Sequence, residues 1–327
     1  MSFKAILVSR DEAKNQSVNI VEMDDDALME GDVLVKVEHT TVNYKDGLAI
    51  TGKAPVIRRW PMIPGIDLAG TVLSSESAEW NAGDKVVLNG WGVGETHYGA
   101  YAGHARLKGE WLIPQPQGLS GHDAMAVGTA GYTAMLCVMA LEEQGIMPAS
   151  GPVLVTGANG GVGSVAVSIL GHLGYHVVAS TGRTAEADFL TGLGAKEIID
   201  RAELSGPAKP LGKERWAAAI DCVGSHTLAN VLSMVNYGGV IAACGLAQGM
   251  DLPGTVAPFI LRGVTLRGVD SVTVPRPRRI KAWQRIAKDL PMDSLRSLSH
   301  TIGFDDLIEA GKAIIDGKVR GRLVADF

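Results

Sequence analysis

A glycine-rich turn in the middle of the chain has the residue types and spacing of a dinucleotide-binding loop. The segment Val153–Gly163 reads VLVTGANGGVG, and it stands between an apolar run typical of a strand and a segment typical of a helix. Glycines let the backbone approach a pyrophosphate closely, and the N-terminus of the following helix offers N–H groups and a partial positive charge. We therefore expect Asn159, Gly160, Gly161 and Val162 to contact a nucleotide cofactor. A purely structural glycine turn is the alternative, and the strand–turn–helix context disfavours it.

The residues at the end of the next predicted strand distinguish between NAD and NADP. Enzymes that use NAD generally place an acidic residue there, where it binds the ribose 2′-hydroxyl. This chain instead has Thr181, Gly182 and Arg183, and Arg201 follows the third predicted strand. Guanidinium groups pair bidentately with phosphate, so the two arginines favour the 2′-phosphate of NADPH. Two solvated surface arginines remain the alternative.

The elements that position these residues follow from the apolar pattern. From about residue 151, strand-like apolar segments alternate with helical ones, and the strand-like segments are 152–156, 176–179, 197–199, 217–221 and 239–243. This alternation predicts an α/β fold in which helices cover both faces of a parallel sheet. Up to about residue 119, the chain reads as short strands separated by turn residues, which indicates a β-rich, barrel-like region. A helix is expected over 278–290 and a closing strand over 321–327.

Length, charge and cysteine usage limit the possible classes of protein. At 327 residues, the chain is long enough for two domains. Its formal net charge of −5 provides no electrostatic reason to bind nucleic acid or an anionic membrane. The stretch 144–182 lacks charged residues, but glycines interrupt it, so we expect a buried strand–turn–helix rather than a membrane span. Cys137, Cys222 and Cys244 lie in apolar sequence, and we expect buried reduced thiols and a cytoplasmic location.

Several motifs together resemble the medium-chain dehydrogenase/reductase superfamily, on its quinone-oxidoreductase-like side. The segments that carry this resemblance are Val42–Asp46, Pro64–Gly70, Gly128–Ala134 and the glycine-rich turn. Three further segments resemble the acryloyl-CoA reductase branch, namely Arg59–Asp67, Cys244–Ala247 and Gly268–Val272. The resemblance implies a GroES-like β-barrel domain over 1–125 and 275–327, and a Rossmann domain with a doubly wound parallel sheet over 126–274. It also implies a homodimer formed by edge pairing of the Rossmann sheets.

The same resemblance assigns roles to polar residues. It places Tyr44 at the nicotinamide end of the site, where the hydroxyl could donate a hydrogen bond or a proton, and a structural role is an equal alternative. Asn43, Asp46 and Asp67 would form the surrounding polar shell. For Asp46 and Asp67, a buried structural network is favoured over acid–base work. Further cofactor contacts are implied for Leu246, Ile260, Ser271 and Gly317. Gly317 stands where a side-chain-bearing residue is expected, so its contact would come from the backbone or be absent.

The motifs predict no bound metal. Zinc-dependent members of the superfamily carry Gly-His-Glu where this chain has Gly65-Ile66-Asp67, and they take further ligands from cysteines near the N-terminus. Isoleucine cannot bind zinc, and all three cysteines here lie at or beyond Cys137. Without a Lewis acid, hydride transfer to an activated C=C bond replaces alcohol oxidation.

The resemblance therefore implies NADPH-dependent reduction of a short α,β-unsaturated acyl-CoA, most simply acryloyl-CoA to propanoyl-CoA. The phosphates of coenzyme A require cations, and the candidates are Lys53, Arg58, Arg59, Arg276, Arg278, Arg279 and Lys281. A solvated charged face is an equal alternative for this set. Two other functions stay open: an NADPH-dependent quinone or free enone reductase, and a catalytically idle NADPH-binding structural protein.

Overall fold

The chain folds into two compact units. The computed structural model describes residues 2–327. The first unit contains residues 2–129, 271–287 and 295–327, and the second contains residues 130–270 and 288–294. From the sequence, we expect a GroES-like domain over 1–125 and 275–327 and a Rossmann domain over 126–274. One segment differs, because residues 288–294 cluster with the second unit whereas the sequence assigns them to the barrel.

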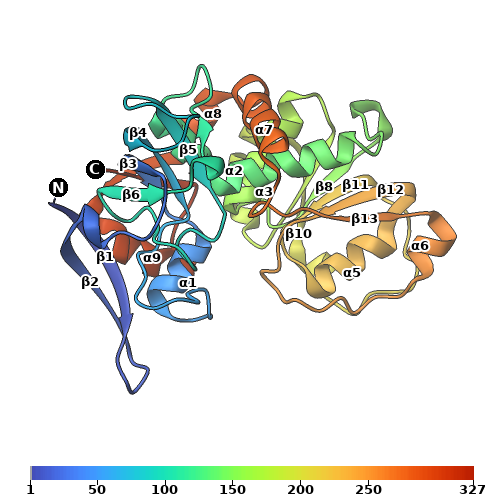
Figure 1. Ribbon diagram of the computed structural model, residues 1–327. Coiled ribbons are helices and arrows are strands. Elements are labelled where there is room, and N and C mark those ends of the chain that lie inside the picture. The colour runs from blue at the N-terminus through green and yellow to red at the C-terminus, as the bar shows by residue number, and fades with distance from the viewer. Residues whose placement is uncertain (1) are drawn as a thin grey trace. The chain divides into compact units, whose positions relative to one another are not determined.

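The second unit is built on a six-stranded parallel sheet (Figure 1). Its strands are β8 (Val153–Val155), β9 (Val177–Thr181), β10 (Ala195–Asp200), β11 (Trp216–Asp221), β12 (Val235–Ala243) and β13 (Thr265–Gly268). They run in the order β10-β9-β8-β11-β12-β13, which is the 3-2-1-4-5-6 order of a doubly wound dinucleotide-binding sheet. The predicted fold class is confirmed. The glycine-rich turn leaves the central strand β8, where the strand order reverses.

Helices cover both faces of this sheet, as right-handed crossovers between parallel strands require. The helices are α3 (Gly161–His172), α4 (Ala187–Gly192), α5 (Ser225–Met234) and α6 (Ala257–Arg262). α3 and α5 lie on opposite faces of the sheet (Figure 1). Leu154, Val178 and Ile241 on the central strands are at most 1% exposed. The continuous apolar runs in the sequence therefore reflect burial on both faces.

The first unit contains a seven-stranded, mostly antiparallel sheet. Its strands are β3 (Val33–Thr41), β4 (Asp67–Ser75), β5 (Lys85–Asn89), β6 (His104–Leu107), β7 (Ile113–Pro114), β14 (Ser299–Gly303) and β15 (Arg322–Asp326). The order is β14-β15-β3-β4-β5-β7, and β6 also pairs with β3. Because β15 lies between β14 and β3, the C-terminal segment completes the N-terminal sheet, as the sequence predicts. Val33, Val35 and Val37 alternate into the core of this sheet.

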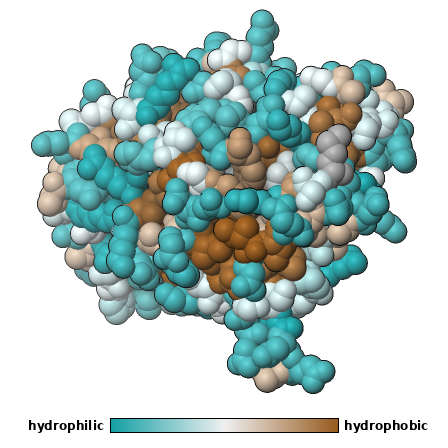
Figure 2. Space-filling model, turned by 90° about the vertical axis from the view of Figure 1, so that its left-hand side faces the viewer, coloured by the Kyte–Doolittle hydropathy of each residue, from teal (hydrophilic) through white to brown (hydrophobic). Residues whose placement is uncertain are grey.

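A hairpin precedes this sheet. β1 (Ser2–Arg10) pairs antiparallel with β2 (Gln16–Asp24), and single bridges from Ala5 and Val8 join the hairpin to the rest of the first unit. The turn of the hairpin projects from the surface, and Figure 2 shows an apolar area on the face next to it. Val18 of β2 packs on the apolar core of the first unit, so the hairpin covers part of that core.

The remaining helices connect these elements. They are α1 (Tyr44–Thr51), α2 (Gly121–Glu142), α7 (Arg276–Asp289), α8 (Met292–Leu298) and α9 (Leu307–Ile315). Short 3₁₀ turns occupy Asp25–Ala27, Gly109–Trp111, Pro148–Ser150, Thr184–Glu186, Arg201–Leu204 and Phe304–Asp306. Among residues 2–327, α2 is the one helix long and apolar enough to cross a membrane, and 94% of its apolar window is buried, as in a core helix. The uncharged stretch 144–182 folds into β8, α3 and β9, as expected.

Candidate active site

The glycine-rich turn forms a backbone cradle that side chains would fill. Gly157 has a φ of 61°, a left-handed conformation that glycine adopts readily. A Cβ atom on Gly163 would lie 2.3 Å from the Gly157 carbonyl oxygen and 2.8 Å from Ala158 Cα. α3 begins at Gly161 with Gly160 as its N-cap, so the first N–H groups of this helix have no partner within the helix. The turn therefore fits the pyrophosphate of a dinucleotide.

Polar side chains connect this turn to the end of β9. The Thr181 hydroxyl donates to Asn159 Oδ1, and the Arg183 backbone N–H donates to the Thr181 hydroxyl at 2.9 Å. The Asn159 side-chain amide donates to Glu186 Oε2 at 2.8 Å. The structure thus brings together three residues that the sequence predicts as cofactor contacts.

Two arginines flank the turn after β9. A Cβ atom on Gly182 would lie 2.5 Å from Arg201 Nε and 2.8 Å from Arg201 Cζ, so the Arg201 guanidinium lies against the Gly182 backbone. Arg183 is the next residue, and its side chain is 43% exposed. Two guanidinium groups at one turn are an arrangement that binds a phosphate ester.

Glu186 adds a carboxylate to this turn that the sequence motifs do not predict. Its Oε2 atom lies 4.0 Å from Arg183 Nη1. The spacing of three residues from Arg183 is the signal that indicates such a pair. A carboxylate here repels a 2′-phosphate and can accept a hydrogen bond from a ribose hydroxyl. The turn therefore carries arginines that favour NADPH and a carboxylate that favours NADH.

Asn43, Asp46 and Asp67 form one buried network at the start of α1. The Asn43 backbone N–H donates to Asp46 Oδ2 at 2.9 Å, and the Asn43 side-chain amide donates to Asp67 Oδ2 at 2.8 Å. Asp46 Oδ1 accepts a hydrogen bond from the Ile66 N–H at 3.1 Å. The two carboxylates are at most 1% exposed. The network joins the N-terminus of α1 to the chain that enters β4.

The Asp67 carboxylate accepts hydrogen bonds from several further groups. The Asn89 amide donates to Oδ1 at 2.7 Å, and Thr129 donates from its hydroxyl to Oδ1 and from its N–H, at 2.8 Å, to Oδ2. The Thr129 N–H points at Asp67 because α2 breaks at Gly128, where φ is 51°. A Cβ atom on Gly128 would lie 2.9 Å from Asp67 Oδ2, so glycine is required there. Both oxygens of Asp67 are engaged within the protein.

Arg322 of β15 completes this network. Its side chain is buried, Nε donates to the Ala126 carbonyl oxygen at 2.9 Å, and Nη2 donates to Thr41 Oγ1 at 3.0 Å and to Asn43 Oδ1 at 3.3 Å. Burial lowers the pKa of the Arg322 guanidinium, and the charge on Asp67 opposes that shift. The motifs do not single out Arg322, although an arginine at the start of an apolar closing strand is a signal for it.

The electrostatics of the network act most strongly on Asp46. Burial raises the pKa of the Asp46 carboxyl from 3.8 to about 7, and the negative charge on Asp67 adds to this shift. The hydrogen bonds that Asp46 accepts from Asn43 and Ile66 act in the opposite direction. At neutral pH, Asp46 is therefore close to the midpoint between its charged and neutral forms.

Tyr44 differs from these neighbours in its exposure. It is the first residue of α1, and its side chain is 56% exposed. Within the part of the chain that the structure describes, the Tyr44 hydroxyl has no hydrogen-bond partner. The network of Asn43 and Asp46 holds the backbone from which the ring projects. Tyr44 can therefore contact a ligand, whereas the carboxylates beneath it are buried.

The other predicted cofactor contacts are divided between the two units. Leu246 and Ile260 belong to the second unit and are exposed. Ser271 and Gly317 belong to the first unit, where Ser271 is half-buried and Gly317 is exposed. Gly317 follows α9 with a φ of 69°, a conformation that accounts for glycine at this turn.

The predicted basic cluster at the start of α7 requires a correction. Arg279 is 1% exposed, and it donates to the carbonyl oxygens of Asn89 at 2.8 Å and Val272 at 3.2 Å. Arg276 donates to Glu79 Oε2 at 2.6 Å. These two arginines anchor α7 to the first unit, so they do not form a phosphate-binding surface. The exposed members of the predicted set are Lys53, Arg58, Arg59 and Lys281, and Arg278 is half-buried.

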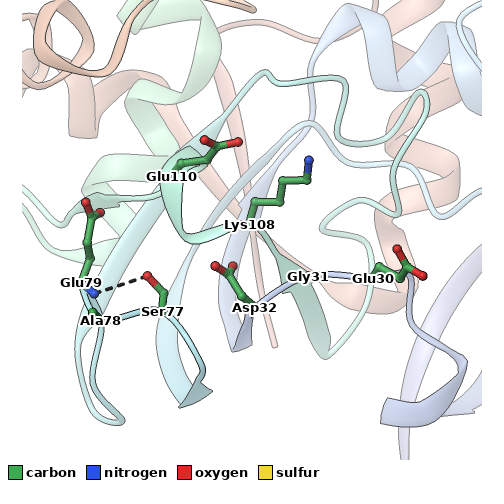
Figure 3. Close-up of a pocket in the computed structure, with 8 residues that line it drawn as sticks. All are labelled: Glu30, Gly31, Asp32, Ser77, Ala78, Glu79, Lys108 and Glu110. Carbon is green, nitrogen blue, oxygen red and sulfur yellow. Dashed lines mark hydrogen bonds between the residues drawn. The ribbon is translucent and has the colours of Figure 1, made fainter.

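A surface pocket of the first unit is lined by none of the predicted cofactor-binding or catalytic residues, although Arg276 bonds to Glu79 in its lining (Figure 3). Its lining consists of Glu30, Gly31, Asp32, Ser77, Ala78, Glu79, Lys108 and Glu110. The carboxylates in this lining outnumber the single cation of Lys108. Such a pocket repels a phosphorylated ligand, so it does not replace the candidate site.

No group of three His, Cys, Asp or Glu side chains among residues 2–327 is arranged to hold a metal ion. The Ile66 side chain is apolar and buried, and the oxygens of the adjacent Asp67 already accept hydrogen bonds. The residues at the Gly-His-Glu position therefore do not fit a zinc ion.

Comparisons with known proteins cover nearly the whole chain. A family model described as "Alcohol dehydrogenase GroES-like domain" matches residues 29–148, and one described as "Zinc-binding dehydrogenase" matches residues 161–288. The chain is 51% identical to acrylyl-CoA reductase AcuI of Ruegeria pomeroyi over 99% of both proteins. It is 42% identical to Bacillus subtilis YhfP, described as a putative quinone oxidoreductase, over 98% of both proteins.

Solved structures agree with this similarity. The yhdH oxidoreductase of Salmonella enterica in complex with NADP is 50% identical, with a TM-score of 0.97 over 100% of both chains. Bacillus subtilis yhfP with NAD bound is 42% identical, with a TM-score of 0.96 over 100% of both chains.

Proposed function

The chain belongs to the medium-chain dehydrogenase/reductase superfamily, and we propose that it reduces the C=C bond of a short α,β-unsaturated acyl-CoA with NADPH. The most suitable substrate is acryloyl-CoA, which becomes propanoyl-CoA. The observation that carries this proposal is the 51% identity to an acrylyl-CoA reductase over 99% of both chains. The glycine-rich turn and the exposed Tyr44 support it independently, because they are the nucleotide cradle and the ligand-facing hydroxyl that such a reaction needs.

The cofactor proposal rests on the turn after β9. Arg183 and Arg201 flank Gly182 there, and they would hold the 2′-phosphate of NADPH. The amides at the start of α3 would hold the pyrophosphate. When bound, NADPH supplies the hydride. Glu186 opposes a phosphate at this turn, so the preference over NADH depends on the two arginines outweighing one carboxylate.

The chain's own residues would act by position and by hydrogen bonding. The Tyr44 hydroxyl would donate to the thioester carbonyl oxygen, where negative charge develops, or would pass a proton to the substrate. Asn43, Asp46 and Asp67 would be positioning residues, because they are buried and their oxygens accept bonds from protein donors. Their network keeps the first turn of α1 in place beneath Tyr44.

A panel of acceptors tests the reaction. NADPH oxidation is measured with acryloyl-CoA, crotonoyl-CoA and a benzoquinone. We expect the highest kcat/KM for acryloyl-CoA. A far higher value for benzoquinone would favour the second candidate, a quinone or free enone reductase, which the 42% identity to a putative quinone oxidoreductase supports. If no acceptor is reduced although NADPH binds, the remaining candidate function is a catalytically idle NADPH-binding protein.

The coenzyme A phosphates would bind at the exposed pair Arg58 and Arg59. Replacing both by Ala should raise KM for acryloyl-CoA and leave the reduction of a free enone unchanged, because these cations act remotely from the reacting carbons. Lys4→Ala removes a cation on β1 that is 56% exposed and lies outside the predicted set, and it serves as the control. Equal changes with both substrates would exclude this pair as a coenzyme A site.

The proposed enzyme is a homodimer and works in the cytoplasm without metal. β13 is the edge strand of the parallel sheet, and its outer backbone groups can pair with a second copy. The chain before it carries apolar side chains that are more than half exposed, namely Leu246, Met250, Val256, Ile260 and Leu261. Sedimentation velocity should show a dimer that Val256→Asp dissociates and Tyr237→Asp, on β12, does not. A monomeric wild-type protein would refute the homodimer.

A further inference from the structure

All three cysteines of the chain meet at one place in the second unit. Cys137 lies on α2, whereas Cys222 and Cys244 follow β11 and β12. The sulfur atoms of Cys222 and Cys244 are 3.8 Å apart, and Cys137 lies close enough for its thiol to lower the pKa of Cys244.

The backbone places Cys222 directly beside Cys244. Asp221 of β11 pairs with Ala243 of β12 in parallel register, and the two cysteines are the first residues after these strand ends. Neighbouring strands lie about 4.8 Å apart, which falls within the Cα–Cα range of about 4.4–6.8 Å for disulfides. The sulfur atoms, now 3.8 Å apart, need to approach to about 2.05 Å, which is a change of side-chain rotamer rather than of fold.

The pair also adjoins the glycine-rich turn. The Cys222 N–H donates to Thr156 Oγ1 at 3.0 Å, and a Cβ atom on Gly157 would lie 3.5 Å from Cys222 Cβ. Ligands of doubly wound sheets bind at the carboxyl ends of the strands, and this is where the pair lies. A change in the Cys222 side chain is therefore transmitted directly to the backbone proposed to hold the cofactor.

The environment makes one of the sulfurs reactive. Cys222 and Cys244 are partly exposed, whereas Cys137 is buried. Hydrogen bonds from Cys137 and Cys222 hold the pKa of Cys244 well below its ordinary value, and the pKa of Cys222 is raised. The thiolate is the form that attacks an oxidant. We assign the attack to Cys244, because hydrogen bonding to its neighbours favours its charged form, and Cys222, 3.8 Å away, is then the thiol that resolves the product.

We propose that Cys222 and Cys244 are an oxidisable pair that a peroxide converts to a disulfide, and that this disulfide weakens cofactor binding at the glycine-rich turn. The Cys244 thiolate attacks a peroxide oxygen, the O–O bond breaks, and a sulfenic acid and hydroxide form. The Cys222 thiol then attacks the Cys244 sulfur, the S–O bond breaks, and water leaves. The hydroxide takes up the proton that Cys244 released, so two thiols and one hydrogen peroxide yield a disulfide and two waters.

Mass spectrometry tests the bond itself. The folded protein is treated with hydrogen peroxide, and its intact mass and peptide map are recorded before and after dithiothreitol. We expect the loss of two hydrogens, a peptide pair joined through Cys222 and Cys244, and full reversal. Cys137→Ala should retain this link, and Cys244→Ser should abolish it. A link through Cys137, or no link in wild type while peroxide consumes free glutathione under the same conditions, would overturn the proposal.

The effect on the cofactor rests on the proposed function and has its own measurement. NADPH binding is titrated by fluorescence with reduced, oxidised and re-reduced protein. We expect at least about tenfold weaker binding after oxidation, recovered with dithiothreitol, and slower disulfide formation when NADPH is bound. If protein that is fully disulfide-linked binds NADPH with unchanged affinity, the proposed effect of the disulfide on cofactor binding is wrong. A reduced protein that does not bind NADPH would instead refute the proposed function, while the mass measurement would still decide the thiol chemistry.

Discussion

Replacing Asp67 by Asn tests the buried network beneath Tyr44. The substitution keeps the shape of the side chain but exchanges one acceptor oxygen for an amide donor. Asp67 Oδ2 faces the Asn43 amide and the Thr129 backbone N–H, both at 2.8 Å. The backbone N–H cannot accept a hydrogen bond, and the Asn43 amide could accept one only by losing the bond from Arg322 to its oxygen. The new amide therefore turns toward the Oδ1 side, where the Thr129 hydroxyl can reverse its bond. Asn89, at 2.7 Å on that side, is left facing a second donor.

The cost follows from these contacts. A buried donor that has no acceptor costs about 1–3 kcal/mol. The hydrogen bonds that remain around residue 67 are also weaker, because their acceptor is no longer a charged carboxylate. We expect Asp67→Asn to lower the free energy of unfolding of the first unit by about 2–4 kcal/mol. Urea unfolding followed by tryptophan fluorescence measures this, because Trp216 alone of the six tryptophans lies in the second unit.

The control for this experiment is Asp305→Asn. Asp305 is 71% exposed and lies 3.5 Å from Lys4, a surface pair of a kind that contributes about 0–1 kcal/mol. The control should change the unfolding free energy by less than about 1 kcal/mol. If Asp67→Asn is as mild as the control, the hydrogen bonds around Asp67 do not carry the stability assigned to them.

Further predictions concern the cofactor, the pH dependence, the reaction and the metal. Arg183→Ala should weaken NADPH binding about tenfold and leave NADH binding unchanged, because a partly exposed charge-assisted contact is lost; equal losses for both would exclude a contact with the 2′-phosphate. Because the pKa of Asp46 is raised to about 7 in the folded protein, its contribution to stability is full below about pH 4 and is lost as pH rises through 7. Asp46→Asn should therefore flatten the decline of unfolding free energy between these pH values, and an unaltered slope would count against the shift. Tyr44→Phe should lower kcat with acryloyl-CoA and with a free enone alike, and a change in KM alone would indicate binding without catalysis. Dialysis against a strong chelator should leave kcat unchanged. Activity that is lost on dialysis and restored by zinc would contradict the conclusion that the residues around Ile66 hold no zinc ion.

Local rules account for the parts of the fold that the sequence alone predicts. The run Val153–Val155 and the glycines that follow form a strand and a cradle because their sterics depend on near neighbours along the chain. The parallel sheet follows from strands that alternate with helices, and the closing strand β15 from a short apolar run at the C-terminus. Asn43, Asp46 and Asp67 stand in segments that resemble motifs of the superfamily, and it is this resemblance that predicts a polar network of these residues.

Contacts between distant segments were decided only by the tertiary structure. Arg279 belongs to a basic run in the sequence, yet it is buried because its guanidinium meets the carbonyl oxygen of Asn89, 190 residues away. Arg322 reaches Asn43 across 279 residues, and Cys222 meets Cys244 only because β11 and β12 pair in register. A charge or thiol in the sequence indicates which chemistry is possible. Whether that group faces solvent, a carboxylate or another thiol depends on which strands pair and how the helices pack. The apolar periodicity of the sequence does not predict these tertiary partners.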